Sequence, residues 1–370
     1  MLLSTLLSTR WMRALSTGLL LGSTCLAGAA EDPVTATASK GGYGDHPGAS
    51  LFIEKMVEQG EDRDFVSGLV LDARPQQSIL DAISRPAEKR LDWGGYSRIF
   101  LGQSRIDQGV EFWDTHEDAL LRASAYYGVA PEVIVAIIGV ETRYGRQAGS
   151  YRVIDALATL AFDYPPRSAF FTTQLGEFIQ LVQEQNLDPG TIKGSYAGAM
   201  GYGQFIPSSY RHYAVDFDQD GRADILSNPV DAIGSVANYF NKHGWRTAEP
   251  VALPASLDRT VDADLLSRSL KPVETLAHWR NLGIKVDPTV ANEAVATALQ
   301  LSSAEGDEYW LGLHNFYVIT RYNHSSLYAM AVYQLSQAIS EQRMAQAPMA
   351  ENPVTEKPVA ENNADEKKGA

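Results

Sequence analysis

Hydrophobic residues recur at helical spacing through most of the chain. Apolar residues three and four positions apart predict a short amphipathic helix that Ser50 caps. The same spacing predicts a longer helix from Val110 to Tyr127, with Gly128 as its end. Pro131 is typical of a first helical turn and opens the next helix. Further helical patterns run through 151–161, 168–185, 230–243 and 325–340.

The pattern changes between 248 and 317. Short apolar runs at 251–254, 309–311 and 316–319 are flanked by turn-forming residues, which is typical of strands. We therefore expect a mainly helical protein of the α+β class. The expected division is a helical core over 48–247, a small mixed α/β insert over 248–317 and a C-terminal helical part over 318–345.

Both ends of the chain differ in composition from the middle. Residues 30–47 are rich in Ala, Thr, Gly and Ser, and we expect a flexible lead-in there. Residues 346–370 repeat Pro, Ala, Glu, Asn and Lys and contain no aromatic residue, so they are expected to form a disordered tail.

The first residues have the pattern of an export signal. Arg10 and Arg13 precede an apolar run that is short for a membrane span, and Ala29 ends a small-residue cleavage pattern. We expect a signal peptide over 1–29 and a soluble, exported, periplasmic product. Cys25 offers a second route, in which a lipid anchor would give outer-membrane association. The residues before Cys25 fit that route less well, and a core helix is the remaining alternative.

Composition excludes several classes of function. The chain has 370 residues, 45% of them hydrophobic, which is enough for two or three domains. A net charge of −14 counts against nucleic acid as a partner. One cysteine excludes an internal disulfide or a cysteine-based zinc cluster. The sequence contains no P-loop, dinucleotide glycine motif or Gly-x-Ser-x-Gly elbow.

Glu141 is the first carboxylate after a continuous apolar run over 133–140. A helix that is apolar on every side is expected to be buried. Burial and the negative end of the helix dipole both favour the protonated carboxyl, which is the form that a general acid needs. Alternatively, Glu141 pairs with Arg143 or Arg152, or reaches solvent at the helix end.

A glycine-rich segment over 193–210 is the second candidate for chemistry. Its glycines allow unusual backbone angles and the close approach of a ligand. Ser195, Gln204 and several tyrosines offer hydrogen bonds and ring faces that suit sugars. Alternatively, the segment is a tight turn that packs against helices.

Together these segments resemble the lytic murein transglycosylase B family, whose soluble and membrane-bound members share a lysozyme-like core within a surrounding helical domain. The resemblance covers roughly residues 45 to 340. The matching segments are 137–145, 155–160, 198–210, 231–240, 321–324 and 328–335.

The resemblance implies an enzyme that cleaves peptidoglycan glycan strands between N-acetylmuramic acid and N-acetylglucosamine without adding water. Glu141 would protonate the leaving oxygen, then take the proton of the muramyl C6 hydroxyl and leave a 1,6-anhydro end, with no cofactor for the chemistry. Two alternatives stay open. One is a hydrolytic muramidase that pairs Glu141 with Asp155, Asp163 or Asp216. The other is a peptidoglycan-binding protein without catalysis.

The resemblance also implies a substrate groove. Ser195 and Gln204 would orient the sugars around the cleaved bond. Only Arg167 stands where family members often carry two adjacent arginines, which puts contact with the peptide stem or a distal sugar in doubt. Each tyrosine could instead be a packed core residue. The expected wall residues are Tyr96, Phe205, Tyr239, Tyr322, Asn323 and Tyr328.

Residues 216–224 match the first nine positions of an EF-hand loop, but Ser227 stands where the usual bidentate Glu is expected. The resemblance implies a cation loop over 216–231 that a later aspartate closes. We expect a structural Ca²⁺ (or Na⁺), with a solvated acidic turn as the alternative. Partners in cell-wall synthesis or hydrolysis stay undetermined. The expected ion-loop residues are Asp216, Asp218, Asp220, Arg222, Asp224 and Asp231.

Overall fold

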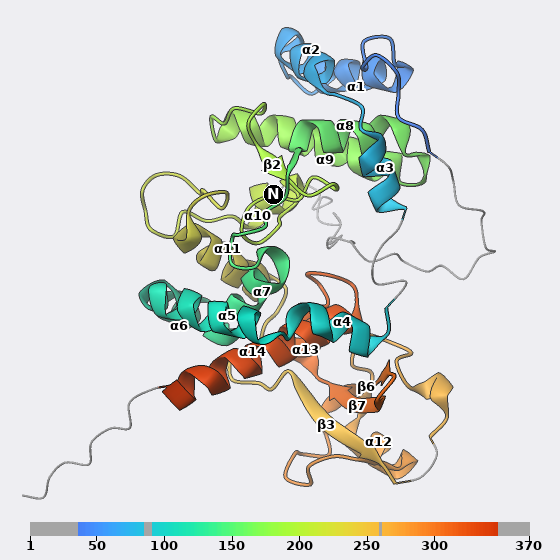
Figure 1. Cartoon of the computed structure of the whole chain (residues 1–370), viewed down its shortest axis with the longest axis vertical. Helices are drawn as coiled ribbons and strands as arrows, with labels where there is room; N and C mark the ends of the chain where they lie inside the picture. The colour runs from blue at the N-terminus through green and yellow to red at the C-terminus, as the bar shows by residue number, and fades with distance from the viewer. Residues whose placement is uncertain (1–35, 85–90, 259–260, 347–370) are drawn as a thin grey trace, which may run out of the picture.

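The computed structural model describes residues 36–84, 91–258 and 261–346 (Figure 1). The predicted signal peptide, Cys25 and the predicted tail from 347 onward lie outside the described residues. The described chain is mainly helical with a small sheet, and this confirms the expected fold class. No single described helix is long and apolar enough to cross a membrane. Only together would α6 (Glu117–Tyr127) and α7 (Pro131–Thr142), which are bent sharply against each other, be long and apolar enough.

The helices form an upper and a lower group that share one hydrophobic core (Figure 1). In the upper group α8 packs on α9 and α3, and in the lower group α14 packs on α7, α5 and α4. The upper helices are α1 (Pro47–Glu58), α2 (Arg63–Asp72), α3 (Gln77–Ile83), α8 (Val153–Asp163) and α9 (Ser168–Glu184). The lower helices are α4 (Trp93–Phe100), α5 (Gln103–Thr115), α6 (Glu117–Tyr127), α7 (Pro131–Thr142), α11 (Pro229–Lys242) and α14 (Ser326–Gln346).

Several short elements lie between these helices in the chain. β1 and β2 pair as a two-stranded antiparallel ribbon, and a loop follows β2 before α10. A 3-10 helix, η2, lies between α8 and α9. Their bounds are β1 (Tyr151–Arg152), η2 (Pro165–Arg167), β2 (Lys193–Gly194) and α10 (Pro207–Tyr213).

The small domain at the bottom of Figure 1 is a five-stranded antiparallel sheet in the order β4-β6-β7-β3-β5. It has a separate core in which Leu276, Trp279 and Leu311 are buried. Its elements are β3 (Ala252–Leu257), η3 (Ala263–Leu265), β4 (Glu274–Thr275), α12 (Leu276–Leu282), β5 (Ile284–Lys285), β6 (Val295–Ser303) and β7 (Gly306–Gly312), and α13 (His314–Ile319) follows it.

Three local predictions differ from the structure. The segment 316–319 belongs to helix α13, because Phe316 and its neighbours are buried on every side and a uniformly apolar run does not distinguish a strand from a helix. The helix expected from Val110 to Tyr127 is divided at His116 into α5 and α6. The first helix begins at Pro47 rather than after Ser50, because the His46 Nδ1 atom accepts the Gly48 N–H as the cap.

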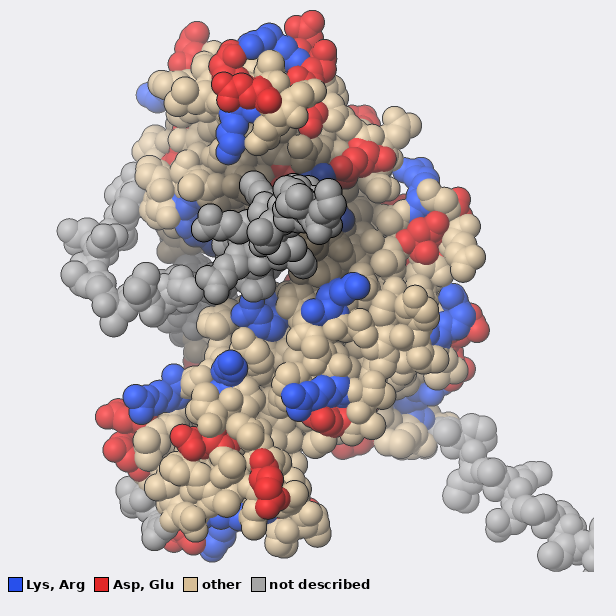
Figure 2. All heavy atoms as spheres, turned by 180° about the vertical axis from the view of Figure 1, so that it is seen from behind, with Lys and Arg blue, Asp and Glu red and all other residues tan. Residues whose placement is uncertain are grey.

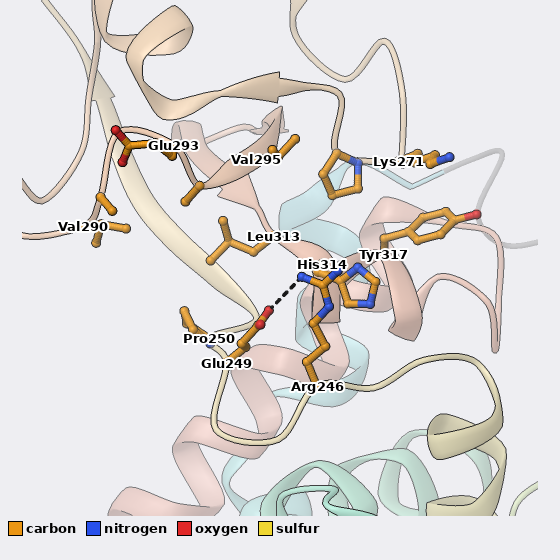
Figure 3. A pocket seen from close by; sticks show the side chains of 13 residues that line it. Arg246, Glu249, Pro250, Lys271, Val290, Glu293, Val295, Leu313, His314 and Tyr317 are labelled. Atoms are coloured by element: carbon orange, nitrogen blue, oxygen red, sulfur yellow. Dashed lines mark hydrogen bonds and ion pairs between the residues drawn. The ribbon is translucent and has the colours of Figure 1, made fainter.

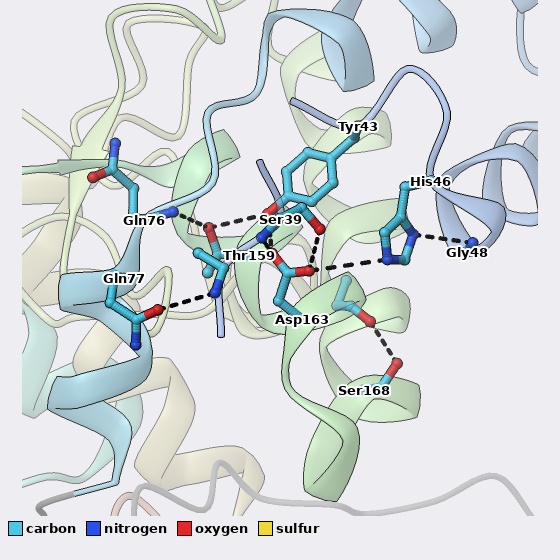
Figure 4. A network of polar contacts seen from close by, with 11 residues as sticks. Ser39, Tyr43, His46, Gly48, Gln76, Gln77, Thr159, Asp163 and Ser168 are labelled. Atoms are coloured by element: carbon cyan, nitrogen blue, oxygen red, sulfur yellow. Dashed lines mark hydrogen bonds and ion pairs between the residues drawn. The ribbon is translucent and has the colours of Figure 1, made fainter. Parts of the chain in front are cut away.

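The described part of the expected flexible lead-in is packed against α8 (Figure 4). Tyr43 is 1% exposed, and its hydroxyl donates to Asp163 Oδ2 at 2.9 Å. The Ser39 hydroxyl and N–H also donate to the Asp163 carboxylate, at 2.5 and 2.9 Å. A buried carboxylate is stable when several donors surround it, so these bonds fix residues 39–46 on the upper group.

The face opposite to that of Figure 1 carries charged side chains of both signs (Figure 2). Lys and Arg side chains are spread across the middle of this face, and acidic side chains are more frequent on the upper lobe and the small domain. Positive and negative side chains are therefore unevenly distributed over this face.

Candidate active site

Glu141 lies in the last turn of α7, the helix that the apolar run predicted. Val133 through Gly139 are buried, whereas Glu141 itself is partly exposed. The Tyr328 hydroxyl, from α14, donates to Glu141 Oε1 at 2.5 Å. Burial and the neighbouring Glu141 charge raise the pKa of Tyr328 well above its usual value, so the phenol keeps its proton. The carboxyl group of Glu141 is therefore held by the Tyr328 hydroxyl and is still partly exposed to solvent.

Aromatic side chains form one wall beside this pair. The Tyr322 ring lies parallel to that of Tyr328, with centroids 6.5 Å apart, and its hydroxyl donates to the Gly203 carbonyl. Tyr239 packs edge-on against Tyr322 at 4.8 Å and donates to the Arg321 carbonyl at 2.5 Å. The centroid of the Phe205 ring lies 5.9 Å from the ring centroids of both Tyr239 and Tyr322. The structure thus brings the expected residues Phe205, Tyr239, Tyr322 and Tyr328 together, with Glu141 at one end.

The glycine-rich segment is a compact loop held by its own hydrogen bonds. The Ser195 Oγ atom accepts the N–H groups of Ala197 at 3.2 Å and Ala199 at 3.1 Å, which leaves its O–H as the group it can offer to a ligand. Gln204 is 8% exposed with a φ of 49°, and its amide nitrogen donates to the carbonyls of Ala148 and Gly201. Both side chains therefore shape this loop.

The glycines of this region make room for protein rather than for a ligand. A Cβ atom on Gly149, whose φ is +101°, would lie 2.0 Å from the Gly194 backbone. A Cβ atom on Gly194 would lie 2.2 Å from the Ala199 carbonyl oxygen. The sequence indicated the close approach of a ligand to these glycines. In the structure, the glycines instead allow the ribbon and the loop to approach each other.

Thr142, which is not among the residues expected from the sequence, joins the end of α7 to the loop. Its hydroxyl donates toward the Tyr202 carbonyl at 2.9 Å and accepts the Gly145 N–H at 2.9 Å. Thr142 is 1% exposed and follows Glu141 directly, so its bonds fix the end of α7. Its position next to Glu141 was the only sign in the sequence that Thr142 could matter. Its bond to the Tyr202 carbonyl depends on the tertiary fold and could not be predicted.

The remaining expected groove residues are Tyr96, Arg167 and Asn323, and they lie in three different parts of the fold. Tyr96, from α4, is 4% exposed and close enough to Tyr328 to contribute to the raised pKa of the Tyr328 phenol. Arg167, at the end of η2, stacks over the rings of Phe170 and Phe171 at 4.5 and 5.1 Å. Burial lowers the pKa of Arg167, which stays charged. Asn323 is partly exposed, next to Tyr322.

The three aspartates considered as a second carboxylate belong to other clusters. Asp155 accepts the Arg74 N–H and pairs with Arg152 at 3.4 Å. Asp163 anchors residues 39–46 (Figure 4). Asp216 accepts the N–H groups of Asp220 and Gly221 within the acidic loop. Each of these carboxylates therefore has a structural role away from the Tyr328–Glu141 pair.

The acidic loop brings Asp216, Asp218, Asp220 and Asp231 together, with one carboxylate oxygen of each within 4.8 Å of the others. Asp231, from α11, is 0% exposed, and burial raises the pKa of its carboxyl group. Asp224, which the EF-hand spacing indicated as a ligand, lies outside this group: its carboxylate accepts from Leu226 and Ser227. Hard oxygen donors in such a group suit Ca²⁺.

A mainly helical fold with a glutamate in the last turn of a buried helix, held by a tyrosine hydroxyl beside packed aromatic rings, is typical of lysozyme-like enzymes that cleave glycans. A family model described as the transglycosylase SLT domain matches residues 45–337. The chain therefore belongs to the SLT-domain lytic murein transglycosylases, enzymes that cleave peptidoglycan without hydrolysis. This confirms the family and the lysozyme-like core that the sequence indicated.

The relatives agree in sequence and in structure. The chain is 43% identical over 314 residues to the membrane-bound lytic murein transglycosylase B of Escherichia coli, covering 82% of this chain and 86% of the relative. A crystal structure of soluble lytic transglycosylase SltB1 from Pseudomonas aeruginosa matches with a TM-score of 0.77 and 49% identity, covering 80% of this chain and 100% of that one.

Two further solved structures contain ligands. Escherichia coli Slt35 in complex with calcium matches with a TM-score of 0.75 and 42% identity, covering 85% of this chain and 100% of that one. Pseudomonas aeruginosa SltB3 in complex with NAG-NAM-pentapeptide matches with a TM-score of 0.70 and 31% identity, covering 79% of this chain and 78% of that one. Structures of this family thus include complexes with a peptidoglycan fragment and with calcium.

Proposed function

We propose that Glu141 is the acid and the base of the cleavage. As an acid it donates its proton to the glycosidic oxygen while the bond to the muramyl C1 breaks. As a carboxylate it then takes the proton of the muramyl C6 hydroxyl, whose oxygen closes on C1 to give the 1,6-anhydro end. The sugar supplies the nucleophile, so one carboxyl group serves both proton transfers.

The observation that carries this proposal is the 2.5 Å hydrogen bond from Tyr328 to Glu141 Oε1. The Tyr328 donor on Oε1 orients the carboxyl group at the partly exposed end of α7, where a substrate can reach it. The same bond stabilises the carboxylate that exists between the two proton transfers. The engagement of Asp155, Asp163 and Asp216 in other clusters favours this mechanism over a hydrolytic muramidase, which needs a second carboxylate beside the first.

The groove residues have distinct parts in this proposal. Tyr322, Tyr239 and Phe205 are each 5% exposed or less, and we assign them to a packed aromatic layer that holds Tyr328 in position behind the sugar-binding surface. The Ser195 hydroxyl and the Gln204 side chain orient the sugars around the cleaved bond. We assign Arg167 to an outer part of the groove, and Tyr96 and Asn323 to positions beside Tyr328 and Tyr322.

The test is mass spectrometry of the muropeptides that the mature protein releases from purified sacculi. The native enzyme is expected to release anhydromuramyl ends, and Glu141→Gln is expected to release none while it still sediments with sacculi. Glu132→Gln, in the first turn of the same helix, is the matched control and should remain active. Reducing ends from the native enzyme would show hydrolysis, and unchanged release by Glu141→Gln would refute the assignment.

The acidic loop is proposed to hold a structural Ca²⁺ (or Na⁺) rather than to take part in the chemistry. Asp216, Asp218, Asp220 and Asp231 supply the carboxylates, and Arg222 stands at the loop position that provides a backbone carbonyl. The calcium complex of Slt35 supports this proposal.

Export to the periplasm is proposed from the signal sequence over 1–29, with cleavage near Ala29 preferred over a lipid at Cys25.

A further inference from the structure

A pocket separate from the Glu141 site lies where the small domain meets the helical body (Figure 3). Its volume is about 570 Å³, within the range of small-ligand sites. One side is formed by Arg246, Glu249, His314 and Tyr317, and the other by small-domain residues that include Lys271 and Glu293. None of these residues belongs to the Glu141 site.

The pocket combines an apolar floor with charges of both signs at its rim. Leu313 and Val295 form part of the floor, and Val295 is 43% exposed although it lies in a strand. Lys271 and Glu293 are exposed on the rim, and within the described residues neither forms an ion pair. Arg246 and Glu249 pair across 3.3 Å with about half of each side chain exposed. Such a lining fits a short zwitterionic ligand with small apolar side chains.

The rim is held in place before any ligand binds. Asn315 is 0% exposed, accepts the Arg246 N–H at 2.9 Å, and donates to the carbonyls of Arg246 and Glu249 at 2.8 and 2.9 Å. The His314 Nε2 atom contacts the Gly244 carbonyl at 2.8 Å. A carbonyl only accepts, so Nε2 carries the proton and Nδ1 is left as an acceptor. A preformed rim lowers the entropic cost of binding.

We propose that this pocket binds the peptide stem of peptidoglycan. The inference rests on the proposed function, since a glycan-cleaving enzyme meets stems at high local concentration. A stem has free carboxylates for Lys271 and Arg246, a free amine for Glu293, and alanine methyl groups for the floor. Binding a stem here and a glycan at Glu141 links two weak contacts on one polymer, which increases the overall affinity for the sacculus.

The first experiment measures binding of a free stem pentapeptide to the mature protein by calorimetry. Lys271→Glu is expected to weaken binding about tenfold or more, the effect of one lost charge-assisted contact. Lys285→Glu makes the same charge change on the exposed edge strand β5, away from the pocket, and should bind like the native protein. Equal binding by all three proteins, or no binding of the peptide by the native protein, would overturn the proposal.

The second experiment compares cleavage of native sacculi with cleavage of glycan strands from which an amidase has removed the stems. Lys271→Glu is expected to raise KM for native sacculi about threefold to tenfold with kcat unchanged, and to leave cleavage of the bare strands unchanged. An equal loss on both substrates would refute stem recognition. Failure of the proposed function would look different, because the native enzyme would then release no anhydromuramyl ends from either substrate.

Discussion

The Tyr328 hydroxyl and Glu141 Oε1 lie 2.5 Å apart, although 187 positions separate the two residues in the chain. The bond joins α14 to the last turn of α7, two helices that pack along each other. Tyr322 and Tyr328 are both buried, and the Glu141 charge helps to raise the pKa of each phenol. The carboxyl group that we assign to the chemistry is therefore oriented by a neutral, protonated donor.

Tyr328→Phe removes this donor and leaves the ring in place. We expect kcat to fall about tenfold to a hundredfold, the effect of losing a hydrogen bond to a charged group, with little change in KM. Steady-state cleavage of soluble glycan fragments measures both constants. Tyr333→Phe, one turn further along α14 with its hydroxyl bonded to the Ala252 carbonyl, is the control. An unchanged kcat in Tyr328→Phe would show that the bond does not serve the reaction.

Gly149→Ala tests whether close packing against the Gly194 backbone is the reason for a glycine at this position. Gly149 and Gly60 have nearly the same φ, +101° and +100°, but the added Cβ meets the Gly194 backbone at 149 and nothing within 4 Å at 60. Gly60→Ala is expected to cost about 1–2 kcal/mol of unfolding free energy, the cost of the left-handed conformation. Gly149→Ala should cost about 1–3 kcal/mol more because of overpacking. Urea unfolding of both variants gives the difference, and equal costs would contradict the packing argument.

Local signals in the sequence were sufficient for the helix that carries Glu141. Pro131 marks its start, and the apolar run over 133–140 indicates burial, and both features act within a few residues. The position of Asp224 was not predictable in this way. EF-hand spacing indicates Asp224 as a ligand but not that its carboxylate accepts the N–H groups of Leu226 and Ser227, whereas Asp231, expected to close the loop, does lie with Asp216, Asp218 and Asp220.

The resemblance indicates which tyrosines to expect in the groove but not their hydrogen-bond partners. The bonds of Tyr328 to Glu141 and of Tyr322 to the Gly203 carbonyl join segments that are far apart in sequence. Residues 39–46 were expected to be flexible because Gly, Ser and Ala dominate the lead-in, and a composition average does not register one buried Tyr43. Long-range contacts therefore account for most of what the sequence did not predict.

Asp220→Asn tests the acidic loop. Asp220 is exposed, and an amide oxygen can still accept the Arg222 N–H, so the loop should keep its shape. We expect calcium affinity to fall about tenfold or more and the calcium-dependent rise in Tm to shrink, since a bound ion stabilises the folded state by mass action. Without calcium, the variant should be at least as stable as the native chain, because repulsion among the carboxylates is reduced. Melting with calcium and with a chelator measures both effects.

Glu58→Gln, at the exposed end of α1, is the matched control for the loss of one negative charge. Its calcium-dependent rise in Tm should equal that of the native protein. If Asp220→Asn also retained the full rise, the acidic loop would not be the site of the ion.

His243 makes stability depend on pH. Its ring stacks on that of Tyr239 with centroids 4.0 Å apart, and burial lowers the pKa of the imidazole below its usual value of about 6.5. The folded state therefore disfavours the proton that the unfolded chain accepts. The stability that the neutral ring contributes is complete above about pH 6.5 and decreases as the pH falls below that value.

His243→Gln should accordingly reduce the loss of unfolding free energy between pH 7.5 and pH 5, by at most about 1 kcal/mol. Some dependence should remain in the variant, because burial also lowers the pKa of His116 and His324. Urea unfolding of the native protein and the variant at both pH values measures the effect. His278→Gln, an exposed histidine in the small domain, is the control and should lose as much stability in acid as the native protein. A pH dependence in His243→Gln equal to that of the control would show that the ring on Tyr239 does not limit stability in acid.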